Sequence, residues 1–150
     1  MLISSMEEFL RNENTEDFVI CAGWFDMFHI GHLNFIRNAK KEGTKLIVVV
    51  MNDEDGRTIK GETRPIINEE QRAEIIDNLK FVDYTIIANY SELGRKQREF
   101  EDIKTNILWN KYIPIIKKLN IKKVFSLEET LKFNGLGDYL ESTGHTIIYS

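Results

Sequence analysis

Five short runs of apolar residues, separated by polar segments, restrict the folds open to this 150-residue chain. The runs are continuous rather than alternating, which is typical of strands that are buried on both faces. Helix-like segments lie between them, and a parallel sheet covered by helices requires this order. The sequence therefore predicts an α/β fold with a doubly wound parallel sheet of about five strands and flanking helices. The expected strands are Phe18–Cys21, Leu46–Met51, Tyr84–Ala88, Val124–Leu127 and Thr146–Tyr149.

Three longer helices are predicted between these strands. One is expected over Leu33–Lys41 and a second over Asn68–Lys80, where Asn68 and the glutamine three residues later form a capping-box pattern. The third is expected over Ile103–Leu119, with a break near Pro114, because proline lacks the N–H that a helix interior needs.

Composition predicts a single globular domain over residues 1–150, of which residues 1–16 form a helical extension. Ser5 and Glu8 have the spacing of a capping box for a short helix on the edge of the sheet.

The net charge is −4 without a basic block, so no nucleic-acid partner is expected. No signal peptide and no apolar segment of about 20 residues is present, and we expect a cytoplasmic protein without a membrane span. Cys21 is the only cysteine, which excludes an internal disulfide.

A turn rich in glycine and histidine, Gly23 to His32, lies between the first expected strand and a helix. Free N–H groups at a helix start attract phosphate, and Gly31 has no side chain to keep it away. Gly31 also allows the rings of His29 and His32 to lie on one side of the turn. The alternatives are a buried core pair and a metal half-site. The i, i+3 spacing and the single further histidine, His145, argue against a helical zinc pair.

A charged segment, Asn52–Pro65, follows the second expected strand and is predicted to be a long polar loop. A solvated connector is the alternative to a functional loop. The ammonium group of Lys60 suits phosphoryl or nucleotidyl transfer, because it can close over a triphosphate and neutralise charge as pyrophosphate leaves.

The turn resembles the first motif of the cytidylyltransferase-like nucleotidyltransferases, Gly-x-Phe-Asp-x-x-His-x-Gly-His. The motif is matched in full by Gly23, Phe25, Asp26, His29, Gly31 and His32. The resemblance continues, in the same order, through Lys60-Gly61, Arg64-Pro65, Glu70-Gln71-Arg72 and Lys80-Phe81-Val82-Asp83. It implies a Rossmann-like fold. Class I aminoacyl-tRNA synthetases share the His-x-Gly-His letters, but 150 residues leave no room for an anticodon-binding domain.

The resemblance also implies roles for individual residues. His29, His32 and Lys60 are the expected catalytic residues, and Mg²⁺ is the expected cofactor. Asp26 is expected either to hold that ion or to cap the histidine turn. Arg72 is expected either near the triphosphate or in an ion pair, with Glu69 as a neighbour on its helix. The expected nucleotide-binding residues are Gly23, Trp24, Phe25, Asp26, Gly31, Asp53 and Arg72, and Trp24 is also expected to narrow the acceptor pocket or stack on the acceptor.

The predicted function is transfer of CMP from CTP to a phosphorylated small molecule, a phosphoalcohol or a sugar phosphate, with release of pyrophosphate. Adenylyl transfer from ATP to a sugar phosphate or a flavin is the first alternative. A non-catalytic domain that binds a nucleotide or a partner is the second, because two family features are missing. The segment Val124–Thr130 lacks the family's glycine, and the chain stops at Ser150 where a closing Ser/Thr motif would begin, as in a truncated protein. A homodimer is left open.

Overall fold

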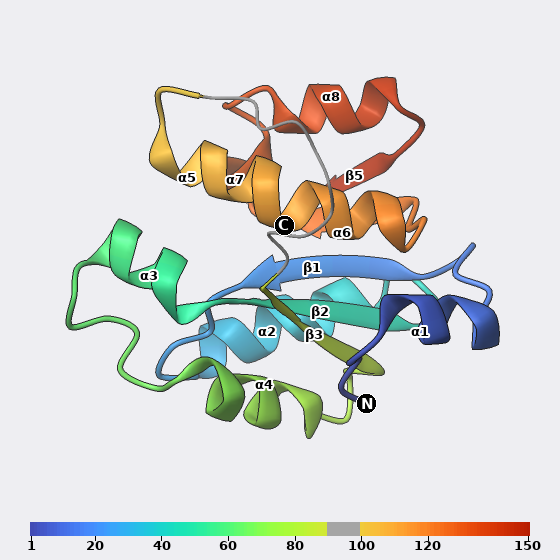
Figure 1. The fold of residues 1–150 in the computed structure, drawn as a ribbon. Helices are drawn as coiled ribbons and strands as arrows, with labels where there is room; N and C mark the ends of the chain where they lie inside the picture. The colour runs from blue at the N-terminus through green and yellow to red at the C-terminus, as the bar shows by residue number, and fades with distance from the viewer. Residues whose placement is uncertain (90–99) are drawn as a thin grey trace.

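Five parallel strands form one sheet in a computed structural model that describes residues 1–89 and 100–150 (Figure 1). Their order is β3-β2-β1-β4-β5, so the chain winds outward in both directions from β1. This arrangement confirms the doubly wound parallel sheet. The predicted bounds of β2, β3 and β5 are matched, and those of β1 and β4 shift by one or two residues. The strands are β1 (Val19–Gly23), β2 (Leu46–Met51), β3 (Tyr84–Ala88), β4 (Lys123–Ser126) and β5 (Thr146–Tyr149).

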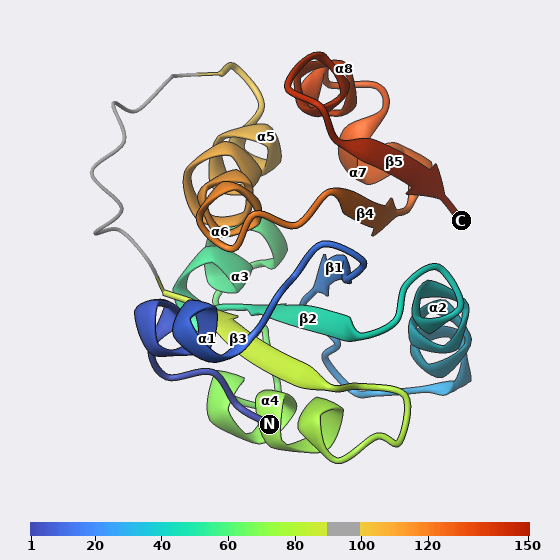
Figure 2. The same ribbon diagram turned by 90° about the vertical axis from the view of Figure 1, so that its right-hand side faces the viewer.

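Helices cover both faces of the sheet, as Figures 1 and 2 show. One face carries α1 (Met6–Asn12) and the helical stretch α5 (Ile103–Ile107), η1 (Leu108–Tyr112) and α6 (Ile113–Lys118). The opposite face carries α2 (Ile30–Lys40) and α4 (Glu69–Asp77). The short helices α7 (Glu128–Leu131) and α8 (Leu136–Ser142) lie beside β4 and β5, and α3 (Asp53–Lys60) follows β2.

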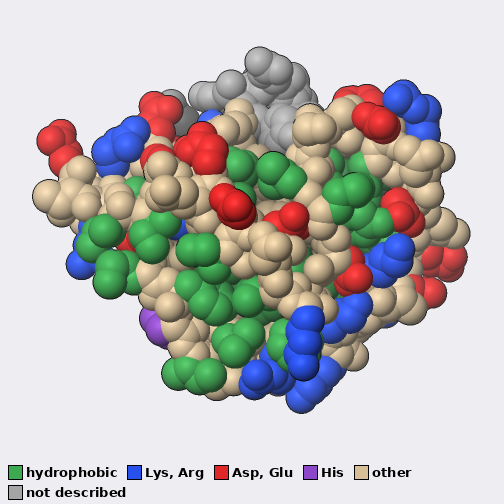
Figure 3. Space-filling model, turned by 90° about the horizontal axis from the view of Figure 1, so that it is seen from below, with side chains coloured by type: hydrophobic (Ala, Val, Ile, Leu, Met, Phe, Trp, Pro, Cys, Tyr) green, Lys and Arg blue, Asp and Glu red, His purple; other side chains and the backbone are tan. Residues whose placement is uncertain are grey.

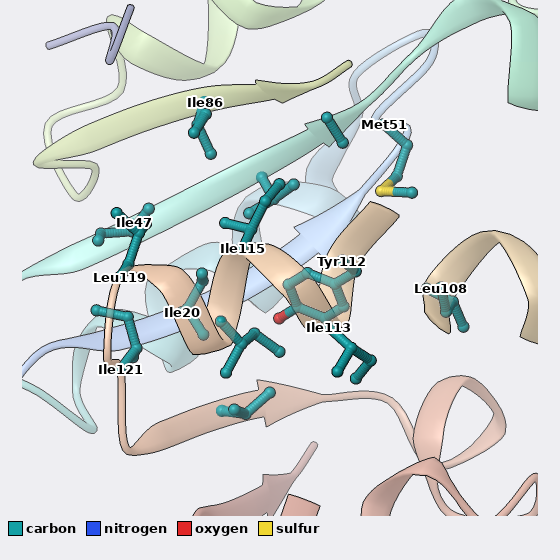
Figure 4. Close-up of a cluster of buried hydrophobic side chains, with 14 of the residues drawn as sticks. Ile20, Ile47, Met51, Ile86, Leu108, Tyr112, Ile113, Ile115, Leu119 and Ile121 are labelled. Atoms are coloured by element: carbon teal, nitrogen blue, oxygen red, sulfur yellow. The ribbon is translucent and has the colours of Figure 1, made fainter. Parts of the chain in front are cut away.

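The core has two halves because successive strand residues point to opposite faces. Ile20, Ile47 and Ile86 meet Ile115 of α6 in one half (Figure 4). Cys21 and its neighbours pack against α2 and α4 in the other half. Cys21 is fully buried, and burial raises the pKa of its thiol well above the ordinary value. It therefore packs as a small apolar residue.

The segment predicted as a polar loop over Asn52–Pro65 is largely helical, and this expectation is corrected. The side chain of Asn52 caps α3 by accepting a hydrogen bond from the N–H of Asp55 at 2.7 Å. Three acidic residues occupy the first turn, where the helix dipole favours negative charge. The loop is thus confined to the residues between Lys60 and α4.

A second difference concerns the helix predicted to break near Pro114. The stretch Ile103–Lys118 stays helical but widens to a π-turn at Leu108–Tyr112, which ends two residues before the proline. The N–H of Ile113 bonds to the carbonyl of Leu108, five residues earlier. Because Pro114 has no N–H to offer, the wider turn absorbs the irregularity without ending the helix.

The N-terminal residues lie along β3, at one edge of the sheet. Leu2 bridges Thr85 in parallel, the Ser5 hydroxyl accepts a bond from the N–H of Glu8 at 3.2 Å, and the ring of Phe9 packs 4.8 Å from that of Tyr84. Most of the polar stretch 89–101, including Tyr90, lies outside the described residues. In the described ranges no helix is long and apolar enough to cross a membrane.

Figure 3 shows the molecule from below, where α4 lies. Ile66 and Ile75 expose apolar side chains in this region, 57% and 40% of their surfaces, and Figure 3 shows basic side chains gathered at another part of the same face. The homodimer that the sequence leaves open stays a prediction.

Candidate active site

A cavity of about 380 Å³ lies beyond the carboxyl ends of β1 and β4, at the point where the strand order reverses. Open α/β sheets bind their ligands at such switch points, and this volume suits a small organic ligand. The start of α2, the end of α3, the helix α5 and the turn after β4 complete its wall. The structure brings most of the predicted site residues to this wall, namely Gly23, Trp24, Phe25, Asp26, His29, Gly31, His32 and Lys60.

The two histidines cap the helix between them. Nδ1 of His29 accepts a hydrogen bond from the N–H of Gly31 at 3.0 Å. In return, the N–H of His29 donates to Nδ1 of His32 at 3.3 Å. Their rings stack with 3.8 Å between centroids. Histidine thus takes the positions of the two polar residues in a capping box.

This reciprocal cap determines where the ring protons lie. Because each Nδ1 accepts a backbone hydrogen bond, each neutral ring carries its proton on Nε2, which becomes a donor. Burial lowers the pKa of His32, and the nearby His29 and Lys60 lower it further, against an opposing effect of Asp26. His32 is therefore neutral near pH 7. The pair offers two N–H donors to a ligand in the cavity.

Both glycines of the motif make room for a ring. A Cβ on Gly31 would lie 2.8 Å from Cε1 of His29, and one on Gly23 would lie 2.8 Å from Cζ of Phe25. Contacts this short do not occur between real side chains, so either substitution would move the ring. The glycines are therefore needed for the positions of His29 and Phe25 as much as for access by phosphate.

Lys60 reaches the cavity from the last turn of α3. Its Nζ lies 5.1 Å from the centroid of the Trp24 ring, a cation–π distance. Trp24 is only 9% exposed and donates its indole N–H to the carbonyl of Asn52 at 3.1 Å. Burial lowers the pKa of Lys60; Asp26 opposes this shift, and Arg72 and Lys104 add to it. Trp24 thus forms a fixed platform beneath Lys60.

Asp26 ties the loop after α3 to the histidine turn. Its two carboxylate oxygens accept hydrogen bonds from the N–H groups of Ile66 and Ile67, at 2.9 and 3.0 Å. Burial opposes ionisation, but these bonds and the charges of Arg72 and Arg64 outweigh it and lower the pKa of Asp26. Over the residues that the structure describes, no group of three or more His, Cys, Asp or Glu side chains is placed to hold a metal ion.

Asp53 and Arg72 lie outside the cavity wall. Arg72 is 1% exposed, and its guanidinium donates to the carbonyls of Trp24, Met51 and Ile67 at 2.7–2.8 Å. It also pairs with Asp53 at 2.6 Å. Asp53 in turn accepts a bond from the N–H of Glu69 at 3.2 Å. Of the two roles expected for Arg72, the structure favours the ion pair, with Asp53 as its partner rather than Glu69.

The cavity also has lining residues that the sequence analysis missed. Lys104 comes from α5, and Ser126, Leu127 and Thr130 come from the end of β4 and from α7. Strand ends at a switch point form ligand sites, so the end of β4 could have been predicted from the fold. No motif or spacing pointed to Lys104.

The sequence model of the family described as cytidylyltransferase-like matches residues 20–137. The bifunctional protein HldE of Campylobacter concisus is 35% identical over 85 residues, which cover 57% of this chain and 18% of the relative. The FAD synthase of Methanosphaerula palustris is 29% identical over 131 residues, which cover 87% of this chain and 84% of the relative. The chain thus spans about a fifth of the length of the first bifunctional relatives and most of the FAD synthase.

Solved structures share the fold at low identity. A lipopolysaccharide core biosynthesis protein from Thermoplasma volcanium has a TM-score of 0.65 at 22% identity, over 89% of this chain and 93% of its own. A pantothenate synthetase from Thermus thermophilus has a TM-score of 0.68 at 12% identity, over 99% of this chain and 60% of its own. These likenesses concern the fold alone, and they confirm the Rossmann-like architecture.

Proposed function

The chain belongs to the cytidylyltransferase-like family, and from this premise we propose that it transfers a nucleoside monophosphate from a nucleoside triphosphate to a phosphorylated small molecule. The observation that carries the proposal is the convergence of His29, His32 and Lys60 on one cavity at the switch point of the sheet. Two N–H donors and one ammonium group around a space of this size suit a triphosphate and an organic acceptor.

The proposed reaction is an in-line displacement at the α-phosphorus. A phosphate oxygen of the acceptor forms the new P–O bond, the bond to the β-phosphate oxygen breaks, and pyrophosphate leaves. Nε2–H of His29 and of His32 donate to oxygens of the α- and β-phosphates, where charge develops as the bond to the leaving group breaks, and the ammonium group of Lys60 offsets the negative charge of the acceptor phosphate as it approaches the α-phosphate. No covalent nucleophile is required, because donors fixed in a dry site each lower the barrier by about 3 kcal/mol.

Magnesium does not fit a site made by the protein alone. Both oxygens of Asp26, the candidate ligand, accept backbone hydrogen bonds, and the described residues offer no other cluster of ligands. We therefore propose that Mg²⁺ enters with the triphosphate.

We propose ATP as the nucleotide. In the sequence analysis, CTP was favoured narrowly over ATP. The histidine motif itself does not distinguish the two, because cytidylyltransferases and adenylyltransferases share it. The FAD synthase, which aligns with 87% of this chain, is named for a product that contains AMP, and this name supports ATP. CTP is the competing nucleotide in the experiments below.

Pyrophosphate release tests this proposal. The protein is incubated with Mg²⁺, ATP or CTP, and one of three phosphomonoesters: FMN, glycerol 3-phosphate or glucose 1-phosphate. We expect release with ATP and at least one acceptor, and a kcat/KM about 100-fold lower for Lys60→Gln. Arg57→Gln is the matched control, since Arg57 lies on the same helix, is exposed and does not line the cavity.

Two results would contradict the proposal. Wild-type turnover with CTP alone would make the chain a cytidylyltransferase. If the folded protein shows no turnover with any pair of nucleotide and acceptor, the result would favour the non-catalytic alternative, a domain that binds a nucleotide or a partner.

A further inference from the structure

Lys104 brings a second ammonium group to the cavity that holds Lys60. It lies on α5, which contacts α3, and it lines the cavity wall. No carboxylate lies within ion-pair distance of Lys104 or Lys60 among the described residues. The nearby Asp102 carboxylate accepts bonds from the N–H and the hydroxyl of Thr105, at 3.0 and 2.7 Å. The proposed function uses Lys60 and assigns nothing to Lys104.

The two sides of the cavity differ in charge. In the sheet, β2 lies on one side of β1 and is followed by α3. On the other side of β1 lies β4, which is followed by α7. The β4 side contributes the uncharged Ser126, Leu127 and Thr130. The α3–α5 side contributes both lysines. The histidine pair, at the start of α2, follows β1 and lies between the two sides.

The proposed chemistry needs positive charge where the acceptor phosphate approaches the α-phosphate. An acceptor phosphate must approach the α-phosphate closely, and two anions repel each other at that range. The histidines donate hydrogen bonds, but His32 is neutral near pH 7 because its pKa is lowered, so it does not offset the acceptor's charge. The lysine ammonium groups on the cavity wall, over the described residues, belong to Lys60 and Lys104.

We propose that Lys104, together with Lys60, binds the phosphate of the acceptor. This inference rests on the proposed function. It makes Lys104 a specificity-determining residue for phosphomonoester acceptors, on the α3–α5 side of the cavity. The mutual repulsion of the two ammonium groups, which contributes to the lowered pKa of Lys60, is relieved when a phosphate dianion binds between them.

Steady-state kinetics of Lys104→Gln tests the inference. KM is measured separately for ATP and for whichever of FMN, glycerol 3-phosphate and glucose 1-phosphate the wild type uses. We expect KM for the acceptor to rise about 10-fold or more, because a charge-assisted bond to phosphate is lost, while KM for ATP changes less than about twofold. Lys104→Arg should restore most of the acceptor binding. Lys111→Gln, on the same helical stretch but away from the cavity wall, should match the wild type.

The outcomes separate this inference from the function on which it rests. If the wild type turns over and Lys104→Gln raises KM for ATP instead, Lys104 binds the triphosphate and the inference is wrong. Unchanged constants for both substrates also overturn it. Equal loss for both substrates with a lowered melting temperature would mean a structural role. No wild-type turnover at all would overturn the proposed function and the inference with it.

Discussion

The two ring nitrogens of His29 have different roles, and substitution by asparagine can remove one role while keeping the other. Nδ1 caps α2 through the N–H of Gly31, whereas Nε2 is left for a ligand. In His29→Asn the amide oxygen can keep the cap, since asparagine is a strong N-cap residue, but the distal donor is lost. We expect the unfolding free energy to stay within about 0.5 kcal/mol of wild type and kcat/KM to fall about 100-fold.

Urea unfolding and pyrophosphate release measure the two effects on the same protein. His29→Ala is the control, because it loses both tasks and should also lose about 1 kcal/mol of stability. Full turnover in His29→Asn would show that Nε2 has no part in the reaction.

Gly31 offers a test in which activity should fall while stability stays near that of wild type. A methyl group there would displace the His29 ring, which lies 2.8 Å from the Cβ position. Alanine favours helix over glycine by up to about 1 kcal/mol, which offsets the cap bond that the displaced ring loses, so Gly31→Ala should unfold at about the same urea concentration as wild type. Its kcat/KM should nevertheless fall about 10-fold or more. Activity equal to wild type would mean that the ring position is not critical.

Residues in the contiguous motif were predictable as a site because one turn carries them all to one place. Arg72 was not predictable in the same way, since its four acceptors come from segments far apart in the sequence, and only the fold brings them together. Lys104 carries no motif, and its place on the wall depends on how α5 packs over α3. Side chains whose role depends on tertiary packing alone therefore escaped the sequence analysis.

At the scale of elements, α3 depends on the buried side chain of Asn52. Its oxygen accepts from the N–H of Asp55 at 2.7 Å, and its amide nitrogen donates to the carbonyl of Ala88 and to the carboxylate of Asp55, both at 2.7 Å. Asn68 caps α4 in the same way, by accepting from Gln71 at 2.9 Å, and is the matched control. We expect Asn68→Ala to lose about 1 kcal/mol of unfolding free energy, and Asn52→Ala to lose about 2 kcal/mol or more, because the carbonyl of Ala88 is left unpaired.

Equal losses in urea unfolding would mean that the bond to Ala88 contributes nothing. Because Lys60 ends the helix that Asn52 begins, we also expect Asn52→Ala to lower turnover, whereas Asn68→Ala should not.

The strands were predictable because a continuous apolar run is a strong local signal, and β2 is buried at every residue. The helix α3 was missed because five of its eight residues are charged, and the segment was interpreted as a long polar loop. The cap at Asn52 followed by three acids was the available signal. The π-turn before Pro114 could not be read from spacing, since the same residues fit an unbroken helix.

At the scale of the molecule, one buried side chain joins the ends of β1 and β2 beside the cavity. Arg72 of α4 bonds to carbonyls just after β1 and at the end of β2, and through Asp53 it holds the first turn of α3. The α3 wall, which carries Lys60, is therefore fixed to the β1 turn, which carries the histidines. The β4–α7 wall has no such link through Arg72. A ligand that touches both walls should bring them together and stabilise the whole sheet.

This arrangement predicts a nucleotide-dependent rise in thermal stability. A ligand that binds only the folded state at 100 times its dissociation constant adds about 2.7 kcal/mol, or roughly 5–10 °C in a domain of this size. We expect that rise with Mg²⁺ and ATP and a smaller one with CTP, and His29→Asn should lose most of it without a change in its own melting temperature. A larger shift with CTP would reverse the proposed nucleotide. Equal shifts in wild type and His29→Asn would mean that the triphosphate binds away from the histidine turn.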